Sequence, residues 1–403
     1  GQTQRLRQII LALMAGPSLM GCLNYFDHNA TAPMNQVARE VWLDAVERYP
    51  GNPSSLHRIG TRADKALEDV RLVLANRLGC SPLDLVWTSG ATESNNMAWY
   101  HIGQTLSADA EVWVSEMEHP CNIESATRWL GNHVKWIPSN GDGLVDLDWL
   151  EAQVRHGKPH LVCIMAANNE TGCLQPWESV RTWCQEQGIA FFCDASQWVG
   201  RLPVSGLGAC DWVSACAHKF GGPKGVGFLK CPSKGRLDAF ILGGPQEMNR
   251  RAGTENVPGI LSMVASLEAR EKEINEESNQ QRLIIQQEFE ALLQSVFPNI
   301  RILGKDVNRL WNTTSVIMPE VDCRIRWVVK LDKEGFAVST GSACSSGKEK
   351  TSHVLASMGL NASEAGRVLR FSSGWDTSLN AWNALSVALQ DVFQKITHSE
   401  RGS

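Results

Sequence analysis

The sequence lacks the features that mark several classes of protein. Its 12 cysteines include no C-x-x-C pair, the spacing typical of zinc ribbons and redox centres. Beyond the N-terminal segment, no apolar run is long enough to span a bilayer, and there are no repeats or low-complexity tracts. Neither sign of charge dominates, because the net charge is only −5. This balance argues against nucleic acid or an anionic membrane as a direct partner.

The composition that remains is that of a globular protein with a large core. The 403 residues suggest two or three folding units, at roughly 150 residues per domain. A hydrophobic fraction of 43% and a charged fraction of 20% are ordinary for such a protein. Cys163, Cys193 and Cys216 lie inside apolar runs, where a free thiol behaves as a small hydrophobic group. We therefore expect reduced cysteines and a cytoplasmic protein that holds no metal.

The N-terminus permits two interpretations. Arg5 and Arg7 precede an apolar run that ends near Cys22, a pattern that is similar to a short secretory or lipoprotein signal. The alternative is an upstream extension or expression remnant, with the native start near Met20. We favour the second interpretation, because the predicted fold needs the segment directly after Cys22.

Short apolar runs alternate with helical patterns through the first two-thirds of the chain. Helices are expected over residues 62–78 and 176–187, where apolar residues recur at helical spacing. Strands separated by helices predict a mainly parallel sheet covered on both faces. The expected strands are 85–88, 112–115, 161–165, 190–193, 212–216 and 226–229.

After residue 256 the pattern changes. A long helical stretch over 257–296 has a polar break near 275–281, and a strand is expected at 314–318. A Gly/Ser-rich loop at 339–347 and a last helix near 379–396 follow. These patterns predict an N-terminal extension (1–24), a large domain (25–255) and a smaller C-terminal α+β domain (256–403) that carries the Gly/Ser-rich loop.

Two polar motifs follow expected strands of the large domain. In the motif 88–94, the chain turns through Gly90 into a helix whose free N–H groups favour an anion, and Thr92 adds a hydroxyl. A plain helix cap is the alternative. Asp194 ends a buried strand, where a carboxylate must be capped, paired or functional. One functional use is to keep a pyridine nitrogen protonated, although capping explains the residue equally well.

Two further motifs contain candidate nucleophiles. Lys219 stands at a strand end beside glycines that allow close backbone approach, which favours a Schiff-base lysine over a surface charge. Lys224 is a second lysine in the same glycine-rich motif and is the alternative candidate. Its position within a Pro/Gly loop predicts that it is exposed to solvent. Cys344 lies in the Gly/Ser-rich loop and is the one cysteine whose neighbours favour reactivity over burial. A linker that happens to contain cysteine is the alternative interpretation.

Taken in order, these motifs resemble those of the cysteine desulfurases, in the aminotransferase class V branch of the fold-type I pyridoxal-phosphate enzymes. The resemblance runs from residue 25 to residue 372, covering most of the chain. Further matching segments are 51–57, 118–122, 167–172 and 251–256. The resemblance implies an α/β fold-type I transferase: a large domain on a mainly parallel seven-stranded sheet, with a smaller C-terminal α+β domain.

The resemblance also implies a role for each matching residue. Lys219 would hold pyridoxal 5'-phosphate, His119 would stack on its ring and relay protons, and Cys344 would receive sulfur from L-cysteine as a persulfide. Asp194 would pair with the ring nitrogen, Gln197 and Asn169 would contact the phenolic oxygen, and Arg370 with Asn169 would bind the substrate. The phosphate would contact Ala91, Thr92, Cys216, His218 and, from the second subunit of a homodimer, Thr254.

Some positions depart from the pattern of the family. Cys216 replaces a serine at the phosphate, and a thiol donates a weaker hydrogen bond. The identity of the sulfur acceptor stays open, as does the purpose of the sulfur in iron–sulfur cluster assembly or thio-modification. Two alternatives also stay open: a selenocysteine lyase or cysteine/cystine C–S lyase of the same fold, and a catalytically silent assembly partner. The retention of Lys219, Asp194, His119, Cys344 and Arg370 argues against a silent protein.

Overall fold

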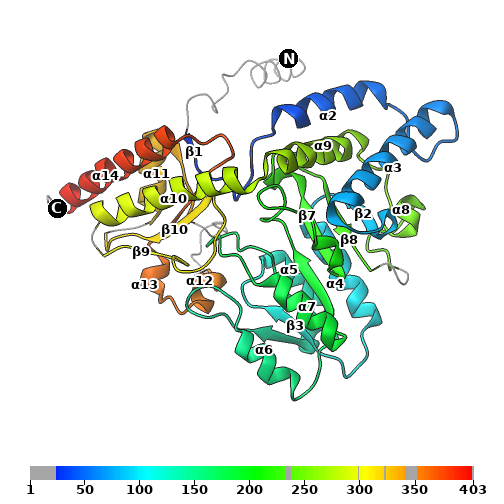
Figure 1. The fold of residues 1–403 in the computed structure, drawn as a ribbon, viewed down its shortest axis with the longest axis horizontal. Helices are drawn as coiled ribbons and strands as arrows, with labels where there is room; N and C mark the ends of the chain where they lie inside the picture. The colour runs from blue at the N-terminus through cyan, green and yellow to red at the C-terminus, as the bar shows by residue number, and fades with distance from the viewer. Residues whose placement is uncertain (1–23, 233–236, 298, 322–323, 341–351, 402–403) are drawn as a thin grey trace, which may run out of the picture.

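The computed structural model describes residues 24–232, 237–297, 299–321, 324–340 and 352–401. The N-terminal interpretations and Cys344 therefore concern positions outside the described residues. Two bodies are visible in Figure 1: a larger one built on a central sheet, and a smaller one that contains the C-terminal helix.

The large body is built on a seven-stranded sheet in the order β2-β8-β7-β6-β5-β3-β4. Only β8 runs antiparallel to its neighbours, so the predicted mainly parallel sheet is confirmed. The strand β4 was missed by the sequence analysis, because it is a partly exposed edge strand that includes Lys135. The strands are β2 (Leu85–Thr88), β3 (Val112–Ser115), β4 (Val134–Ile137), β5 (Leu161–Cys163), β6 (Ala190–Asp194), β7 (Trp212–Cys216) and β8 (Gly227–Lys230).

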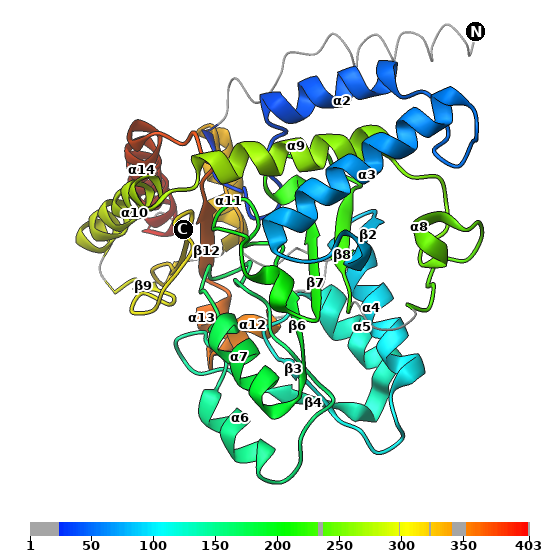
Figure 2. The ribbon, with the colours of Figure 1, turned by 45° about the vertical axis from the view of Figure 1, so that its right-hand side comes forward.

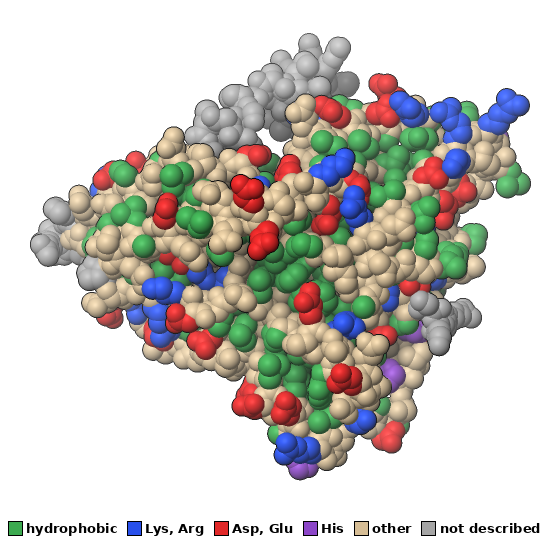
Figure 3. Space-filling view, viewed as in Figure 1, with side chains coloured by type: hydrophobic (Ala, Val, Ile, Leu, Met, Phe, Trp, Pro, Cys, Tyr) green, Lys and Arg blue, Asp and Glu red, His purple; other side chains and the backbone are tan. Residues whose placement is uncertain are grey.

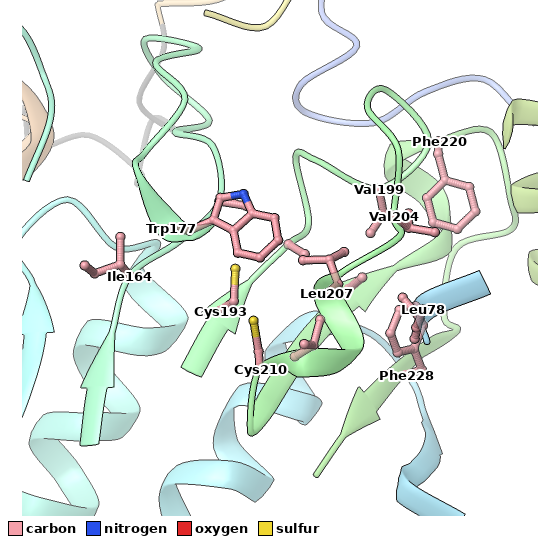
Figure 4. Close-up of a cluster of buried hydrophobic side chains, with 14 of the residues drawn as sticks. Leu78, Ile164, Trp177, Cys193, Val199, Val204, Leu207, Cys210, Phe220 and Phe228 are labelled. Carbon is pink, nitrogen blue, oxygen red and sulfur yellow. The ribbon is translucent and has the colours of Figure 1, made fainter. Parts of the chain in front are cut away.

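Both faces of this sheet are buried, and neighbouring residues along each strand serve opposite faces. Phe191 belongs to one buried cluster and Phe192 to another, as the two-residue period of a strand requires. The first cluster includes residues of α3 (Arg58–Leu78), α7 (Trp177–Gln187) and α9 (Val257–Glu273). The second includes residues of α4 (Ala91–Thr105) and α5 (Pro120–Leu130). Figure 4 shows part of the first cluster, in which Trp177, Phe220 and Phe228 are labelled.

The smaller body has its own core around an antiparallel sheet of order β12-β10-β9. Its strands are β9 (Arg301–Ile302), β10 (Thr313–Ile317) and β12 (Val368–Ser372). Phe289, Trp327, Phe371 and Leu389 meet in this core. The helices of this part are α10 (Glu276–Val296), α11 (Arg324–Lys333), α12 (His353–Ser357), α13 (Ala362–Ala365) and α14 (Leu379–Arg401).

The polar break expected at 275–281 is much shorter than predicted. Asn275 caps α10, since its side chain accepts from the N–H of Ser278 while the Ser278 hydroxyl receives the N–H of Asn275. This capping box allows the polar residues that follow to be helical. The polar run thus marks the start of a helix rather than a loop.

The two bodies share segments across the boundary predicted at residue 256. Helix α9 lies along α2 (Gln36–Arg48) and α3, on the large body (Figure 2). Phe26, near the start of the chain, belongs to the core of the small body. The strand β1 (Asn24–Tyr25) pairs with β11 (Phe336–Ala337) beside it. The division at 256 stays a prediction.

Four short 3₁₀ segments and two short helices complete the described elements. They are η2 (Pro82–Asp84), η3 (Gly131–His133), η4 (Leu207–Ala209), η5 (Ala217–Lys219), α6 (Leu147–Val154) and α8 (Gln246–Asn249), of which α6 covers the far end of the sheet. Basic and acidic side chains are interspersed over the face drawn in Figure 3. Within the described ranges, no helix combines the length and apolar character needed to cross a membrane.

Candidate active site

The carboxyl ends of six strands lie on one edge of the large sheet, and several candidate residues follow these ends. Asp194 is the last residue of β6, and Cys216 ends β7 directly before η5. Ligands of open α/β sheets bind at this edge. A cavity of about 470 Å³ opens there. Its lining includes nine residues that the sequence analysis selected: Ala91, Thr92, His119, Asn169, Asp194, Gln197, Cys216, His218 and Lys219.

Lys219 is placed in this cavity by η5 and held by backbone groups. Its Nζ donates to the carbonyl oxygens of Asn29 and Ala30, the second at 2.9 Å. Burial lowers the pKa of Lys219 to about 8, and the positive charges of Arg201 and Arg370 act in the same direction. A substantial fraction of the amine is therefore neutral near pH 8, and a neutral amine is a nucleophile and a base.

Asp194 is buried and surrounded by donors. The backbone N–H of Ser196 donates to Oδ1 at 3.0 Å, and Asn95 Nδ2 donates to Oδ2 at 3.0 Å. Asn122 Nδ2 donates to the same oxygen at 3.4 Å. Three donors and no acceptor are the partners that suit a carboxylate. Asp194 is thus a fixed negative group in the wall of the cavity.

The start of α4 forms an end of the cavity that suits an anion. Gly90 precedes the helix with φ of 155°, and no side chain caps its first N–H groups. Free N–H groups and the helix dipole attract negative charge. Burial raises the pKa of the Cys216 thiol to about 11, so this side chain is a neutral, weak donor.

His218 is a neutral ring at the same end of the cavity. Its Nδ1 lies 3.1 Å from the Thr31 hydroxyl. Burial lowers the pKa of His218 to about 4, and Lys219, Lys224 and Arg201 lower it further. The ring therefore takes part in hydrogen bonds without a charge of its own at neutral pH.

His119 caps α5 while its ring lines the cavity. Its Nδ1 accepts from the backbone N–H of Cys121 at 3.2 Å. Burial lowers the pKa of His119, although Asp194 opposes this shift. The imidazole is therefore neutral over most of the physiological range.

Two predicted residues lie outside the cavity lining, and a third is not among the described residues. Arg370 in β12 does not line the cavity; its Nη1 donates to Asn169 O at 2.9 Å and its Nη2 to Asp27 Oδ1 at 2.7 Å. Thr254 is exposed on the surface of this subunit and also lies outside the cavity lining. Cys344 is outside the described residues. Lys224, the competing lysine, lines the cavity and is exposed as predicted.

The sequence analysis assigned no role to two residues that organise the site. Asn29 is buried: its Nδ2 donates to Thr313 Oγ1 at 2.8 Å, and its carbonyl oxygen accepts from Lys219 and from Gln197 Nε2. Asn95 bridges Asp194 and Cys121. Neither residue stands at a strand end or in a glycine-rich turn, so no local pattern marks them. Asn29 does lie near the start of the range 25–372 over which the resemblance runs.

Gly227 allows the turn at Gly90 to lie against β8. A Cβ atom at Gly227 would come within 2.5 Å of Ala215 O and 2.7 Å of Gly90 Cα, and neither backbone atom can swing away. We expect Gly227→Ala to lower the free energy of unfolding by about 2 kcal/mol or more, through overpacking. Urea denaturation measures this. Gly141→Ala is the matched control, since a Cβ there meets nothing within 4 Å; equal losses in both variants would contradict the steric explanation.

Comparisons with known proteins agree with the family and the fold expected from the sequence. The family model for aminotransferase class-V matches residues 24–376. The chain is 35% identical over 380 residues to "Cysteine desulfurase IscS" of Dictyoglomus turgidum, covering 92% of this chain and 95% of that protein. It is 36% identical over 370 residues to an "IscS-like cysteine desulfurase" of Mycobacterium tuberculosis, covering 89% and 92% of the two chains.

Solved structures of similar proteins share the fold of this chain. A NifS-like protein from Rickettsia africae superposes with a TM-score of 0.82 at 30% identity, covering 92% of this chain and 99% of that chain. The expected fold-type I architecture is confirmed. The chain belongs to the aminotransferase class V family, among its cysteine desulfurases.

Proposed function

We propose that this chain is a pyridoxal-phosphate-dependent sulfurtransferase that converts L-cysteine to L-alanine and takes the sulfur on Cys344. The observation that supports it most is that Lys219 and Asp194 line the same cavity. The pKa of Lys219 is lowered to about 8, and Asp194 is buried. A lysine that is part neutral and a fixed carboxylate are the two groups that chemistry on an aldehyde-bearing pyridine requires.

The residues present fit pyridoxal 5'-phosphate along the length of the cavity. The uncapped start of α4, with Ala91, Thr92, Cys216 and His218, would hold the phosphate. Asp194 would pair with the ring nitrogen, and His119 would stack on the ring. Gln197 Oε1 is buried without a hydrogen-bond partner among the described residues, which leaves it available to a bound group. With Asn169, Gln197 would face the phenolic oxygen.

When bound, the cofactor supplies an electron sink for bond changes at the α carbon of an amino acid. Lys219 would hold the cofactor through its aldehyde carbon, and its amine, once free, would remove the α proton as a base. Arg370 would bind the substrate carboxylate together with Asn169, in place of part of its contact with Asp27. His119 would move protons at the substrate sulfur.

Sulfur transfer is the step assigned to Cys344. Its thiolate would attack the sulfur of the substrate, so that an S–S bond forms as the C–S bond breaks. The products are L-alanine and a persulfide on Cys344, which passes its outer sulfur to an acceptor protein of unknown identity. We place this reaction in the cytoplasm and expect no direct contact with nucleic acid or membrane.

A homodimer would complete each site. Thr254 lies on the surface of its own subunit, outside the cavity, and would reach the phosphate of the partner subunit. The Arg251 guanidinium, three residues before Thr254, is fixed to Glu93 at the start of α4 by an ion pair of 2.7 Å. This pair supports the proposal that the 251–256 segment is held in place for such a contact.

The proposal is tested by incubating the purified protein with L-cysteine and pyridoxal phosphate. We expect equal amounts of alanine and transferable sulfur, and a mass increase of one sulfur atom on the Cys344 peptide. Cys344→Ser is expected to keep the cofactor but to lose persulfide formation. A selenocysteine lyase or a C–S lyase would release its product at the wild-type rate in this variant, and a silent protein would form no alanine at all; either result would contradict the proposal.

A further inference from the structure

The thiol of Cys121 lies in the wall of the cavity, within hydrogen-bond distance of two polar side chains. Its Sγ is 3.0 Å from His119 Nδ1 and 3.1 Å from Asn95 Nδ2. A buried cysteine usually packs as a small hydrophobic group, and these contacts are unusual for that role.

The direction of each hydrogen bond follows from the amide of Asn95. Its Nδ2 donates one hydrogen to Asp194 Oδ2 at 3.0 Å, which fixes the amide, because the opposite orientation would turn an oxygen toward the carboxylate. The second hydrogen points to Cys121 Sγ, so the sulfur accepts there. The S–H hydrogen is then left to donate to His119 Nδ1. Burial raises the pKa of the Cys121 thiol to about 12, and this keeps the hydrogen in place.

His119 Nδ1 therefore accepts from two donors on one residue, the backbone N–H and the thiol of Cys121. A ring nitrogen that accepts carries no proton, so the proton of the neutral ring is on Nε2. The charged groups that act on this ring are Asp194, which favours its protonation, and Lys219 and His353, which oppose it. The two hydrogen bonds from Cys121 also oppose protonation of His119, because both stabilise the neutral ring.

We propose that Cys121 is a positioning residue, whose thiol holds the imidazole of His119 in its neutral form with the proton on Nε2. The hydrogen bonds then run without a break from Asp194 through Asn95 and Cys121 to His119. The value of this arrangement for catalysis rests on the proposed function, in which His119 moves protons, whereas the state of the ring does not. A thiol placed in this way makes His119 Nε2 a hydrogen-bond donor toward a group in the cavity.

The test measures the protonation of His119 directly, with diethyl pyrocarbonate, which reacts with neutral imidazole. The rate of modification of the His119 peptide is followed by mass spectrometry between about pH 4 and pH 8, a range that spans the usual titration of histidine. The full-length protein is used as purified and after dialysis to remove cofactor. The variants are Cys121→Ala, Cys121→Ser, which keeps a donor, and Cys80→Ala, a control far from His119 in sequence and outside the cavity lining.

Loss of the thiol donor in Cys121→Ala is expected to raise the midpoint for His119 by about half a pH unit, roughly threefold in the protonation constant. Cys121→Ser and Cys80→Ala are expected to keep the wild-type midpoint. Superimposable curves for Cys121→Ala and wild type would overturn the proposal, and so would a serine variant that behaves like alanine. Far-UV circular dichroism checks that each variant is folded.

Turnover provides a second readout. In the holoenzyme, the acid limb of the kcat profile should move upward by the same half pH unit in Cys121→Ala, with KM for cysteine unchanged. A failure of the proposed function is recognised separately, because it would remove cysteine turnover from the wild type while leaving the modification curves as predicted. An unchanged modification midpoint in an active enzyme would refute the role of Cys121 alone.

Discussion

Replacing Lys219 by alanine is expected to abolish both the covalent attachment of pyridoxal phosphate and the turnover of cysteine. Among the described residues, Lys219 is the only lysine lining the cavity whose pKa is lowered, to about 8. Under the proposed function, the variant would lack both the attachment point of the cofactor and the base for the α proton. A base placed in this way contributes about a hundred- to ten-thousandfold to a rate, so kcat should fall by roughly a thousandfold or more.

Lys224→Ala is the matched control for this experiment. Lys224 lines the same cavity, only five residues away, but it is exposed and its amine has solvent around it. We expect Lys224→Ala to keep the visible absorbance of the protein–cofactor complex, whereas Lys219→Ala should show only non-covalent cofactor. Absorbance spectra before and after gel filtration separate the two cases. A Lys219→Ala protein that keeps the covalent complex would refute the assignment.

The second large effect is expected for Asp194→Asn. The substitution removes the negative charge that would keep the ring nitrogen protonated, and a misplaced electrostatic group of this kind costs about a hundred- to a thousandfold in kcat. The new amide also turns a donor toward either the Ser196 N–H or Asn95 Nδ2, which both donate to the carboxylate now. We therefore expect a kcat loss of roughly a hundredfold or more, together with weaker cofactor binding.

Asp211→Asn separates this electrostatic effect from a general loss of stability. Asp211 precedes β7, at the opposite edge of the sheet, and its Oδ2 accepts from the N–H of Phe191 at 2.8 Å. Loss of stability is expected in both variants, whereas the loss of kcat is expected only in Asp194→Asn. Denaturant unfolding and steady-state kinetics measure the two quantities. Equal kcat in Asp194→Asn and wild type would show that the carboxylate has no part in the reaction.

Much of the fold was predictable because its central strands are buried on both faces. Such strands appear as short continuous apolar runs, and six of the seven were located in this way. The edge strand β4 carries Lys135 and is partly exposed, so its pattern resembles that of a loop. The polar start of α10 was misread as a break for a similar reason, since its helix depends on a capping box rather than on apolar periodicity.

The candidate site was predictable where chemistry coincides with local structure. Asp194, Cys216 and Lys219 follow strand ends, and Gly90 marks a turn into a helix. The resemblance to a family then added residues that no single pattern selects, such as Asn169 and Gln197. The roles of Asn29, Asn95 and Cys121 were not predicted, because they come from contacts between segments far apart in the sequence: Asn29 with Thr313, Asn95 with Asp194, and Cys121 with Asn95. Only the folded chain shows that these side chains meet.

The most direct test is to find where the cofactor is attached. The protein is incubated with pyridoxal phosphate, reduced with borohydride to make the bond permanent, digested and analysed by mass spectrometry. We predict a phosphopyridoxyl group on the peptide that contains Lys219, and that the yield rises with pH up to about 8, as the amine loses its proton. Attachment at Lys224, or no attachment to any lysine, would contradict the proposed function.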